Sequence, residues 1–325
     1  MRAVVFDQPG DPDVLRVGEA PAPQVADDEL LVRVHATAVN RADLLQRRGA
    51  YPPPPGASPI LGLELAGEVL RPAGPWRAGD RVMAVVTGGG YAELAAVPQG
   101  VALPIPDQFS YVEAAAIPEA FLTAFLNLFT LGRLQAGEAV LIHAGASGVG
   151  TAAIQLARAV GARVFATAGS AAKLALCREL GAELAINYRD EPFAVRVSAA
   201  TGGRGVDLVL DFVGAPYWEA NLATLGVGGR LMLIGFLGGS AGRLDLGPIL
   251  TKSLTVAGTT LRRTPLEHKV ALSRAFAESA LPRFAQGELR PVIDTVYPLT
   301  QVVEAHRALE ANQTAGKVVL QVAPD

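Results

Sequence analysis

A glycine-rich turn at residues 143–150 is the segment whose spacing most directly predicts chemistry. It reads His-Ala-Gly-Ala-Ser-Gly-Val-Gly, so Gly145, Gly148 and Gly150 follow the spacing G-x-x-G-x-G. An apolar strand-like segment precedes it and an apolar-periodic helical segment follows. Glycines let a backbone approach a pyrophosphate closely, and the N–H groups and dipole of a following helix favour anions. The turn therefore predicts a dinucleotide site, with a plain ligand-free turn as the alternative.

The end of the next predicted strand bears on which dinucleotide binds. NAD sites usually place an acidic residue there, which bonds the ribose 2′-hydroxyl. Here the strand ends Ala-Thr-Ala-Gly-Ser at 166–170, without an acid, and Lys173 follows. Tyr188 and Arg189 follow the next short strand. An uncharged strand end beside a cation suits a 2′-phosphate, so we predict NADP(H), although Lys173 alone would read as a solvated helix lysine.

Further strand ends are expected to line the same groove, because open α/β sheets bind ligands at the carboxyl ends of their strands. The residues that we assign to cofactor binding on this ground are Val213, Gly235, Phe236, Leu237 and Thr260. Each of these loops taken singly also fits a simple turn.

The elements that must position these residues alternate between strands and helices from residue 139 to about 259. The predicted strands are 139–143, 163–167, 207–212, 229–234 and 254–258, and the predicted helices are 149–160, 171–180, 192–200 and 217–225. This rhythm predicts a Rossmann doubly wound parallel sheet.

The sequence on either side of this sheet has another pattern. Short apolar strands separated by Pro/Gly clusters fill the first hundred residues, which suggests a small barrel or sandwich. The tail after residue 262 is too short for a domain of its own. We therefore predict an α/β fold in which the Rossmann domain, 123–262, is inserted in a β domain formed by 1–122 and 263–325.

Composition excludes several classes of protein. Half of the residues are hydrophobic and 18% are charged, which argues against disorder. The net charge of -3 gives no reason to expect nucleic acid or an anionic membrane as a partner. The single cysteine, Cys177, cannot form an intrachain disulfide, and we recognise neither a signal peptide nor a membrane span. These features predict a cytoplasmic location.

The placed motifs resemble those of the medium-chain dehydrogenase/reductase superfamily, specifically the zeta-crystallin-like quinone oxidoreductases and their tumour-suppressor-inducible branch. The likeness rests on residues 38–54, 143–153 and 168–174 and extends over the whole chain. It implies that the β domain is a GroES-like β-barrel. It also implies NADPH-dependent reduction of quinones or related enones, by hydride or by single electrons, in a homodimer or homotetramer.

The resemblance also implies roles for individual residues. Gly169, Lys173 and Tyr188 fall where such enzymes hold the 2′-phosphate. The positions expected near the rest of the cofactor are Thr123, Ser147, Val149 and Phe236. Asn40 and Tyr51 are expected beside the nicotinamide and the substrate, and Asn40 is counted with both the cofactor and the catalytic residues.

Zinc is not expected at this site. Zinc alcohol dehydrogenases of the superfamily place a cysteine near Asn40 and a His-Glu pair where this chain has Leu63 and Glu64. Zinc needs three or four Cys, His or carboxylate ligands, and the four histidines form no short-spaced pair. We expect Glu64 to be a buried hydrogen-bonded carboxylate, and each histidine to be structural or solvent-facing.

Without a metal, catalysis depends on proximity between the nicotinamide and the acceptor. We expect Tyr51 and Asn40 to donate hydrogen bonds to the acceptor oxygen, although Tyr51 precedes four prolines and could only pack a rigid loop. Asp43 and Arg47 read as a surface pair.

Two alternatives to quinone reduction stay open. One is an NADPH-dependent reductase of alkenal, enone or enoyl-thioester C=C bonds. The other is a cofactor-binding structural or regulatory protein without turnover. The strand at 254–258 is a candidate for edge-to-edge pairing across a dimer.

Overall fold

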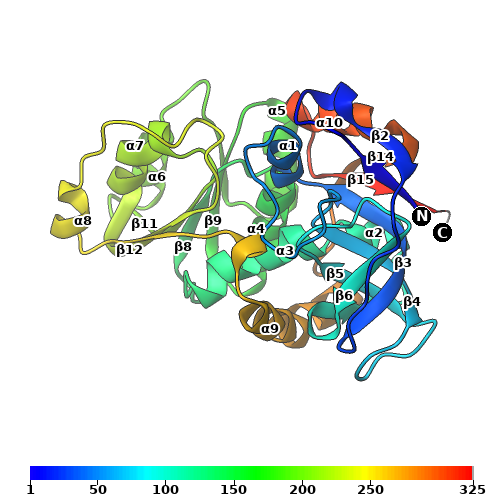
Figure 1. Cartoon of the computed structure of the whole chain (residues 1–325). Helices are drawn as coiled ribbons and strands as arrows, with labels where there is room; N and C mark the ends of the chain where they lie inside the picture. The colour runs from blue at the N-terminus through cyan, green and yellow to red at the C-terminus, as the bar shows by residue number, and fades with distance from the viewer. Residues whose placement is uncertain (324–325) are drawn as a thin grey trace. The chain divides into compact units, whose positions relative to one another are not determined.

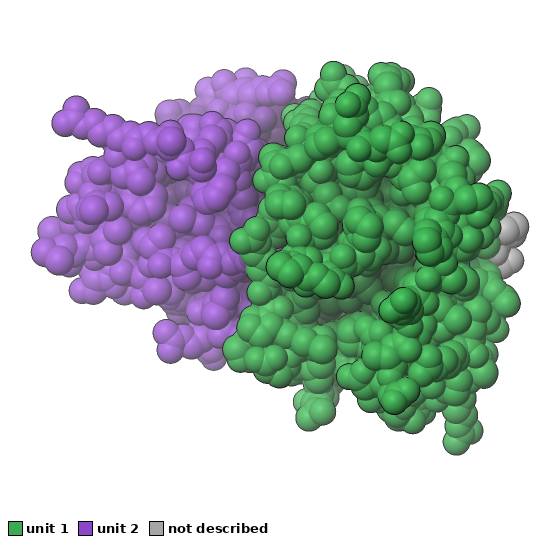
Figure 2. Space-filling model, viewed as in Figure 1, with its two compact units in different colours: residues 1–122, 261–325 green, residues 123–260 purple. Residues whose placement is uncertain are grey.

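The structure is a computed structural model, and it describes residues 1–323. The chain divides into two compact units, Met1–Leu122 with Leu261–Asp325, and Thr123–Thr260 (Figure 2). We refer to them as unit 1 and unit 2. No helix in residues 1–323 combines the length and apolar character needed to cross a bilayer.

Unit 2 is built on six parallel strands in the order β10-β9-β8-β11-β12-β13 (Figure 1). Their bounds are β8 Ala139–Ile142, β9 Arg163–Ala168, β10 Leu184–Asn187, β11 Val206–Asp211, β12 Leu225–Leu233 and β13 Thr255–Gly258. All four residues of β8 are buried, as expected for a central parallel strand that is covered on both faces. The predicted doubly wound parallel sheet is confirmed.

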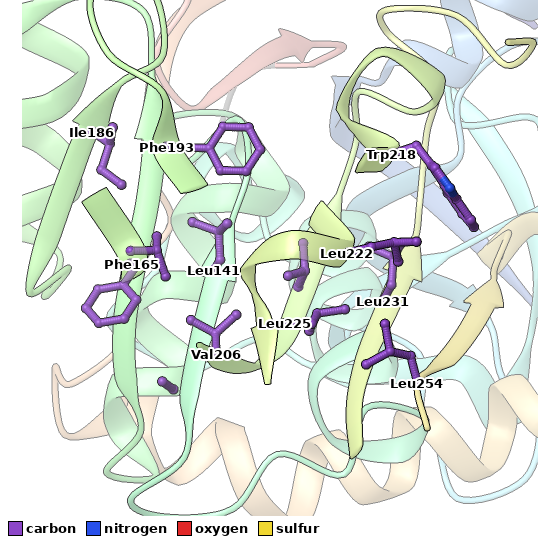
Figure 3. Close-up of a cluster of buried hydrophobic side chains, with 13 residues drawn as sticks. Leu141, Phe165, Ile186, Phe193, Val206, Trp218, Leu222, Leu225, Leu231 and Leu254 are labelled. Atoms are coloured by element: carbon purple, nitrogen blue, oxygen red, sulfur yellow. The ribbon is translucent and has the colours of Figure 1, made fainter. Parts of the chain in front are cut away.

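The helices of unit 2 follow the strands as predicted. They are α4 Gly148–Ala159, α5 Ala171–Glu179, α6 Phe193–Ala200, α7 Trp218–Thr224 and the short α8 Gly247–Thr251. Figure 3 shows how one face is closed: Phe193 of α6 and Leu222 of α7 belong to the same buried cluster as Leu141, Phe165 and Leu231 from the strands. This packing fixes the strand ends from which the predicted cofactor loops emerge.

Unit 1 contains a mixed sheet of seven strands in the order β14-β15-β3-β4-β5-β7, with β6 also paired to β3. The bounds are β3 Glu29–Val39, β4 Glu64–Arg71, β5 Arg81–Val85, β6 Leu94–Pro98, β7 Ala102–Pro104, β14 Ile293–Pro298 and β15 Lys317–Gln321. Two further strands, β1 Arg2–Val5 and β2 Arg16–Glu19, pair with each other. The antiparallel pairing of β15 with β3 brings the C-terminal part of the chain into the sheet of the first hundred residues.

The helices of unit 1 surround this sheet. They are α1 Arg41–Arg47, α2 Tyr111–Ala115, α9 Leu266–Ala285 and α10 Val302–Glu310. Helix α3, Pro118–Phe125, begins in unit 1 and continues into unit 2, where a π-helical turn, Leu126–Thr130, follows it. Helix α2 ends at Ala115, and α3 starts at Pro118.

Helix α1 was not predicted, and it corrects one expectation. The carboxylate of Asp43 accepts the backbone N–H of Asn40 at 2.8 Å and that of Gly62 at 3.0 Å. Arg47 pairs with Glu310 on α10, and both Asp43 and Arg47 are fully buried. The prediction that Asp43 and Arg47 form a surface pair is therefore wrong. Asp43 binds nearby backbone, whereas Arg47 finds its ion-pair partner 263 positions along the chain.

Candidate functional site

The glycine-rich turn of unit 2 leads from β8 directly into α4. The Ser147 side chain accepts the N–H of Gly150 at 3.0 Å and so caps the helix. A Cβ at Gly150 would lie 2.3 Å from the carbonyl oxygen of Ala144, which no side chain tolerates. Gly150 is therefore required for the helix to start this close to the turn. The arrangement presents the N-terminus of a 12-residue helix beside a half-buried glycine turn, which is the geometry that binds phosphates.

A buried network of polar side chains lies next to this turn. His143 contacts Thr167 Oγ1 through Nδ1 at 3.0 Å and Asn221 Oδ1 through Nε2 at 2.7 Å. Asn221 donates its amide hydrogen to Asp211 at 3.1 Å, so its oxygen faces His143, and Nε2 is the imidazole nitrogen that donates. Burial lowers the pKa of His143 to about 4, which keeps the ring neutral. The network ties together the ends of β8, β9 and β11, and His143 has the structural role predicted for it.

Two of the three predicted 2′-phosphate residues, Gly169 and Tyr188, meet at the end of β9. A Cβ at Gly169 would lie 2.7 Å from the hydroxyl of Tyr188 and 3.1 Å from Nε of Arg189, so these side chains lie directly over Gly169. Ser170 caps α5 by accepting the N–H of Lys173 at 3.4 Å, which places Lys173 in the first turn of that helix. No acidic side chain follows β9 before α5. Arg189 was noted in the sequence but was not among the predicted site residues.

The loops after β11 and β12 pair with each other. Leu237 donates its N–H to Phe212 at 2.9 Å, and Gly238 donates to Val213 at 2.9 Å. Phe236 and Leu237 each keep 56% of their side chain exposed. Exposed apolar side chains beside Gly235 are available to pack against a ligand, and the cofactor-binding role of this loop stays a prediction.

Thr123 and the segment at Thr259–Thr260 are linked through Asn127, which the sequence reasoning missed. Asn127 is fully buried in the π-helical turn and donates from Nδ2 to the carbonyl oxygen of Thr123 at 2.8 Å. Its Oδ1 accepts the hydroxyl of Thr259 at 3.0 Å. π-Helical turns often occur at functional sites. Here the turn joins two of the predicted cofactor segments within unit 2.

Asn40 in unit 1 lies in a buried cluster with Glu64 and Lys317. Glu64 Oε1 accepts from Asn40 Nδ2 at 2.8 Å and from Lys317 Nζ at 2.7 Å. Lys317 also donates to Asn40 Oδ1 at 2.6 Å. The predicted burial of Glu64 is confirmed, and the sequence reasoning missed Lys317. Asn40 donates its remaining amide hydrogen to Ala38 at 3.2 Å, so a bond to an acceptor oxygen would have to replace one of these contacts.

Glu119 adds a second carboxyl group to the same cluster. Its backbone N–H donates to Glu64 Oε2 at 2.8 Å, and its side chain is half-buried. Burial, with the neighbouring Glu64 as the second cause, raises the pKa of Glu119 to about 8 from the ordinary 4.5. Burial also raises the pKa of Asp43 to about 6.

The raised pKa of Glu119 predicts how stability depends on pH. Between pH 4.5 and 8 the folded state holds a proton that the unfolded state has released, so the free energy of unfolding falls as pH rises. His143 and His306, whose pKa values burial lowers to about 4 and about 3, act in the opposite direction, but only below about 6.5. We therefore expect urea denaturation to show falling stability from pH 6.5 to 8. Glu119→Gln should be flat over that range, and an equally steep decline in that variant would contradict the assignment.

Tyr51 lies close to two arginines of unit 1. The Cζ atoms of Arg262 and Arg263 are 5.4 Å and 5.7 Å from the centre of its ring, within cation–π range. Arg262 also donates weakly to the Tyr51 carbonyl oxygen at 3.4 Å. The side chain of Tyr51 is half-buried. The sequence reasoning assigned no role to Arg262 or Arg263 and missed this contact.

At the positions where zinc alcohol dehydrogenases have their ligands, this chain has Asn40, Leu63 and Glu64. Asn40 and Glu64 are bound to Lys317, and Leu63 is fully buried. Within residues 1–323, no group of three or more His, Cys, Asp or Glu side chains is placed to hold a metal ion.

Comparison with known proteins identifies the family. Residues 148–278 match the zinc-binding dehydrogenase family, and residues 26–107 match the alcohol dehydrogenase GroES-like domain. The quinone oxidoreductase of Lama guanicoe is 31% identical over 328 residues, which cover 98% of this chain and 97% of that protein. The chain belongs to the medium-chain dehydrogenase/reductase superfamily, in the family that contains these quinone oxidoreductases. The predicted GroES-like domain and family resemblance are confirmed.

Comparison with solved structures supports the same family assignment. The quinone oxidoreductase of Thermus thermophilus, solved alone and with NADPH, is 38% identical with a TM-score of 0.84, covering 99% of this chain and 100% of that one. A structure described as an NAD-dependent alcohol dehydrogenase is 34% identical with a TM-score of 0.89, covering 99% and 100%.

Some relatives are much longer than this chain. A phenolphthiocerol/phthiocerol polyketide synthase of Mycobacterium tuberculosis is 32% identical over 324 residues. These cover 98% of this chain but only 14% of that synthase.

Proposed function

We propose that this protein is an NADPH-dependent oxidoreductase that reduces quinones or related conjugated carbonyls. The observation that carries the proposal is the corner at the end of β9, where Tyr188 and Arg189 lie over Gly169 and no acidic residue stands between β9 and α5. Full-length likeness to quinone oxidoreductases, including one solved with NADPH, supports the same assignment.

The residues fit NADP(H). Backbone leaves no room for a Cβ at Gly150, a Cβ at Gly169 would crowd the Tyr188 hydroxyl, and the α4 N-terminus suits the pyrophosphate. Val213, Phe236 and Thr260 lie after the strands of the same sheet edge. When bound, the cofactor supplies a hydride to the acceptor. In this proposal Lys173 and Arg189 hold the 2′-phosphate, while Tyr51 orients the acceptor.

The test is consumption of NADPH, followed by its absorbance, with a panel of acceptors and with NADH in parallel. The panel contains a benzoquinone, a naphthoquinone, an ortho-quinone, an alkenal and an enoyl thioester. Quinone turnover that favours NADPH is expected. Turnover of the alkenal or thioester alone would instead assign a C=C reductase, the activity class for which the polyketide synthase relatives give some support. NADPH binding without any turnover would indicate a structural or regulatory protein.

Substitution of Tyr51 by phenylalanine tests the proposed hydrogen bond to the acceptor. The ring and its contacts with Arg262 and Arg263 are retained, so only the hydroxyl is lost. We expect kcat to fall about tenfold to a hundredfold, the range for losing one hydrogen bond to a charged group, while NADPH affinity stays unchanged. Unchanged turnover in Tyr51→Phe would remove the role of the hydroxyl and leave Tyr51 as a packing residue.

We also propose a homodimer or homotetramer in the cytoplasm. β13 is the last strand of its sheet, and Leu246 and Leu250 on the adjoining segment are 62% and 85% exposed. An exposed edge strand with apolar neighbours favours pairing with a second copy. Light scattering that reports a monomer at micromolar concentration would contradict the assembly.

A further inference from the structure

We propose that Arg262 forms an anion site in unit 1 that stabilises the negative charge developing on the acceptor oxygen during reduction. The inference rests on the proposed function and deepens it by naming the group that receives the charge. It concerns acceptors whose reduction produces an aromatic or enolic oxyanion.

The first observation is that Arg262 is buried without a counter-ion. Only 5% of the residue is exposed, and within residues 1–323 no carboxylate lies at ion-pair distance from its guanidinium. Nε donates to the carbonyl oxygen of Thr87 at 2.8 Å, whereas Nη2 is shielded from solvent and has no hydrogen-bond partner among the described residues. A buried, unpaired guanidinium is costly. Proteins accept such a loss of stability where the charge is needed to bind a ligand.

Other buried cations of unit 1 show the contrast. Lys317 pairs with Glu64, and Arg47 pairs with Glu310. Next to Arg262, the buried Lys269 donates from Nζ to the Arg262 backbone carbonyl oxygen at 2.9 Å. Asp43 and Glu119 act electrostatically on Arg262, but among the described residues neither forms a direct ion pair with its guanidinium. A partly buried charge without a direct partner attracts an anion more strongly than one in water.

The second observation is the position beside Tyr51. The Cζ atom of Arg262 lies 5.4 Å from the centre of the Tyr51 ring. The proposal requires that the Tyr51 ring move enough for an acceptor oxygen to reach Nη2. Tyr51 is the residue proposed to orient the acceptor. The hydroxyl of Tyr51 and Nη2 of Arg262 would then donate to the same region, and a donor fixed in place before the reaction needs no reorganisation when charge develops.

The electron balance shows where negative charge develops. Hydride addition to the quinone, with both electrons supplied by the nicotinamide when it is bound, would give the hydroquinone monoanion. One proton from solvent or Tyr51 would then neutralise the anion. Arg262 holds the anion between these two events and gains or loses no proton itself, since guanidinium stays charged.

The experiment compares Arg262→Gln and Arg262→Lys with a matched control, Arg263→Gln. Arg263 is exposed and lies at a similar distance, 5.7 Å, from the Tyr51 ring. In Arg262→Gln we expect kcat for benzoquinones to fall about 100-fold, as when one donor to an oxyanion is lost. Arg262→Lys should recover part of this loss, and the control should stay within about twofold.

Three readouts separate this role from a structural one. First, the loss in Arg262→Gln should shrink along a series of quinones whose hydroquinones are stronger acids, since their anions need less stabilisation. Second, 4-nitrophenolate, an aromatic oxyanion, should bind at least about tenfold more weakly to Arg262→Gln than to the wild type. Third, the melting temperature of Arg262→Gln should stay the same or rise, because a buried unpaired charge is removed.

Each contrary outcome is distinct. A uniform loss across the quinone series with a lower melting temperature would overturn the proposal in favour of a structural arginine. A rise in KM confined to a sulfonate-bearing quinone would show that Arg262 binds a preformed anionic substituent, which also overturns it. Wild-type protein without quinone turnover would refute the proposed function, whereas an active wild type matched by Arg262→Gln would refute this inference alone.

Discussion

Lys317→Met is expected to destabilise the protein by about 3–5 kcal/mol, the cost of leaving one partner of a buried ion pair uncompensated. Lys317 is 5% exposed and Glu64 is not exposed at all, and their charged atoms are 2.7 Å apart. After the substitution Glu64 keeps only the hydrogen bonds from Asn40 and from the backbone of Glu119. Urea denaturation, followed by circular dichroism, measures the change.

Two further variants make this result interpretable. The double variant Glu64→Leu/Lys317→Met removes both charges and should recover much of the loss, so that the effects of the single changes are not additive. Arg163→Met is the control: its pair with Glu183 is exposed, and its loss should cost less than about 1 kcal/mol. If Lys317→Met lowers the free energy of unfolding no more than Arg163→Met does, the interpretation of Lys317 and Glu64 as a buried ion pair is contradicted. If Lys317→Met does not fold, the double variant still decides the question.

The double variant Lys173→Ala/Arg189→Ala is expected to raise the KM for NADPH about 100-fold or more and to leave the KM for NADH nearly unchanged. The 2′-phosphate is the group by which the two cofactors differ, and it carries nearly two negative charges. Each hydrogen bond to a charged group contributes about 1.5–3 kcal/mol, which for one bond is already about tenfold to a hundredfold. Steady-state kinetics with both cofactors measures the ratio.

The control for this prediction is Arg196→Ala. Arg196 lies on α6, is exposed and pairs with Glu191, so it lies outside the proposed phosphate site. Its KM values should stay within about twofold of the wild type. Equal losses for NADPH and NADH in the double variant would indicate general damage to the fold. No loss for either would show that the corner at Gly169 does not bind a 2′-phosphate.

The elements of unit 2 were predictable because their signals are local. Alternation of short apolar strands with apolar-periodic helices depends on residues within one segment, and so does the requirement for glycine at Gly150. The caps at Ser147 and Ser170 are likewise set by residues three positions apart. Helix α1 carried a similar local signal, an Asn-x-x-Asp pattern at Asn40 and Asp43, which the sequence reasoning overlooked.

The candidate site in unit 1 was predicted less completely because its contacts are not local. Lys317 meets Glu64 across 253 positions in the sequence, and Arg262 meets Tyr51 across 211. Nothing in the neighbouring residues indicates that Arg262 is buried while Arg263 is exposed. Charged residues in a short basic run or on a helix read as solvent-facing, since burial of charge is rare unless distant partners accept it.

By itself, the sequence determined the class of the fold, the glycine turn that suits a pyrophosphate and the uncharged strand end that favours a 2′-phosphate. These follow from periodicity, from backbone freedom and from the absence of an acid at one position. Only the tertiary structure decided which charges are buried and how they pair, because burial and ion pairing depend on segments that meet through the sheet. The orientation of Asn40 by Lys317 and Glu64, and the unpaired guanidinium of Arg262, belong to that second group.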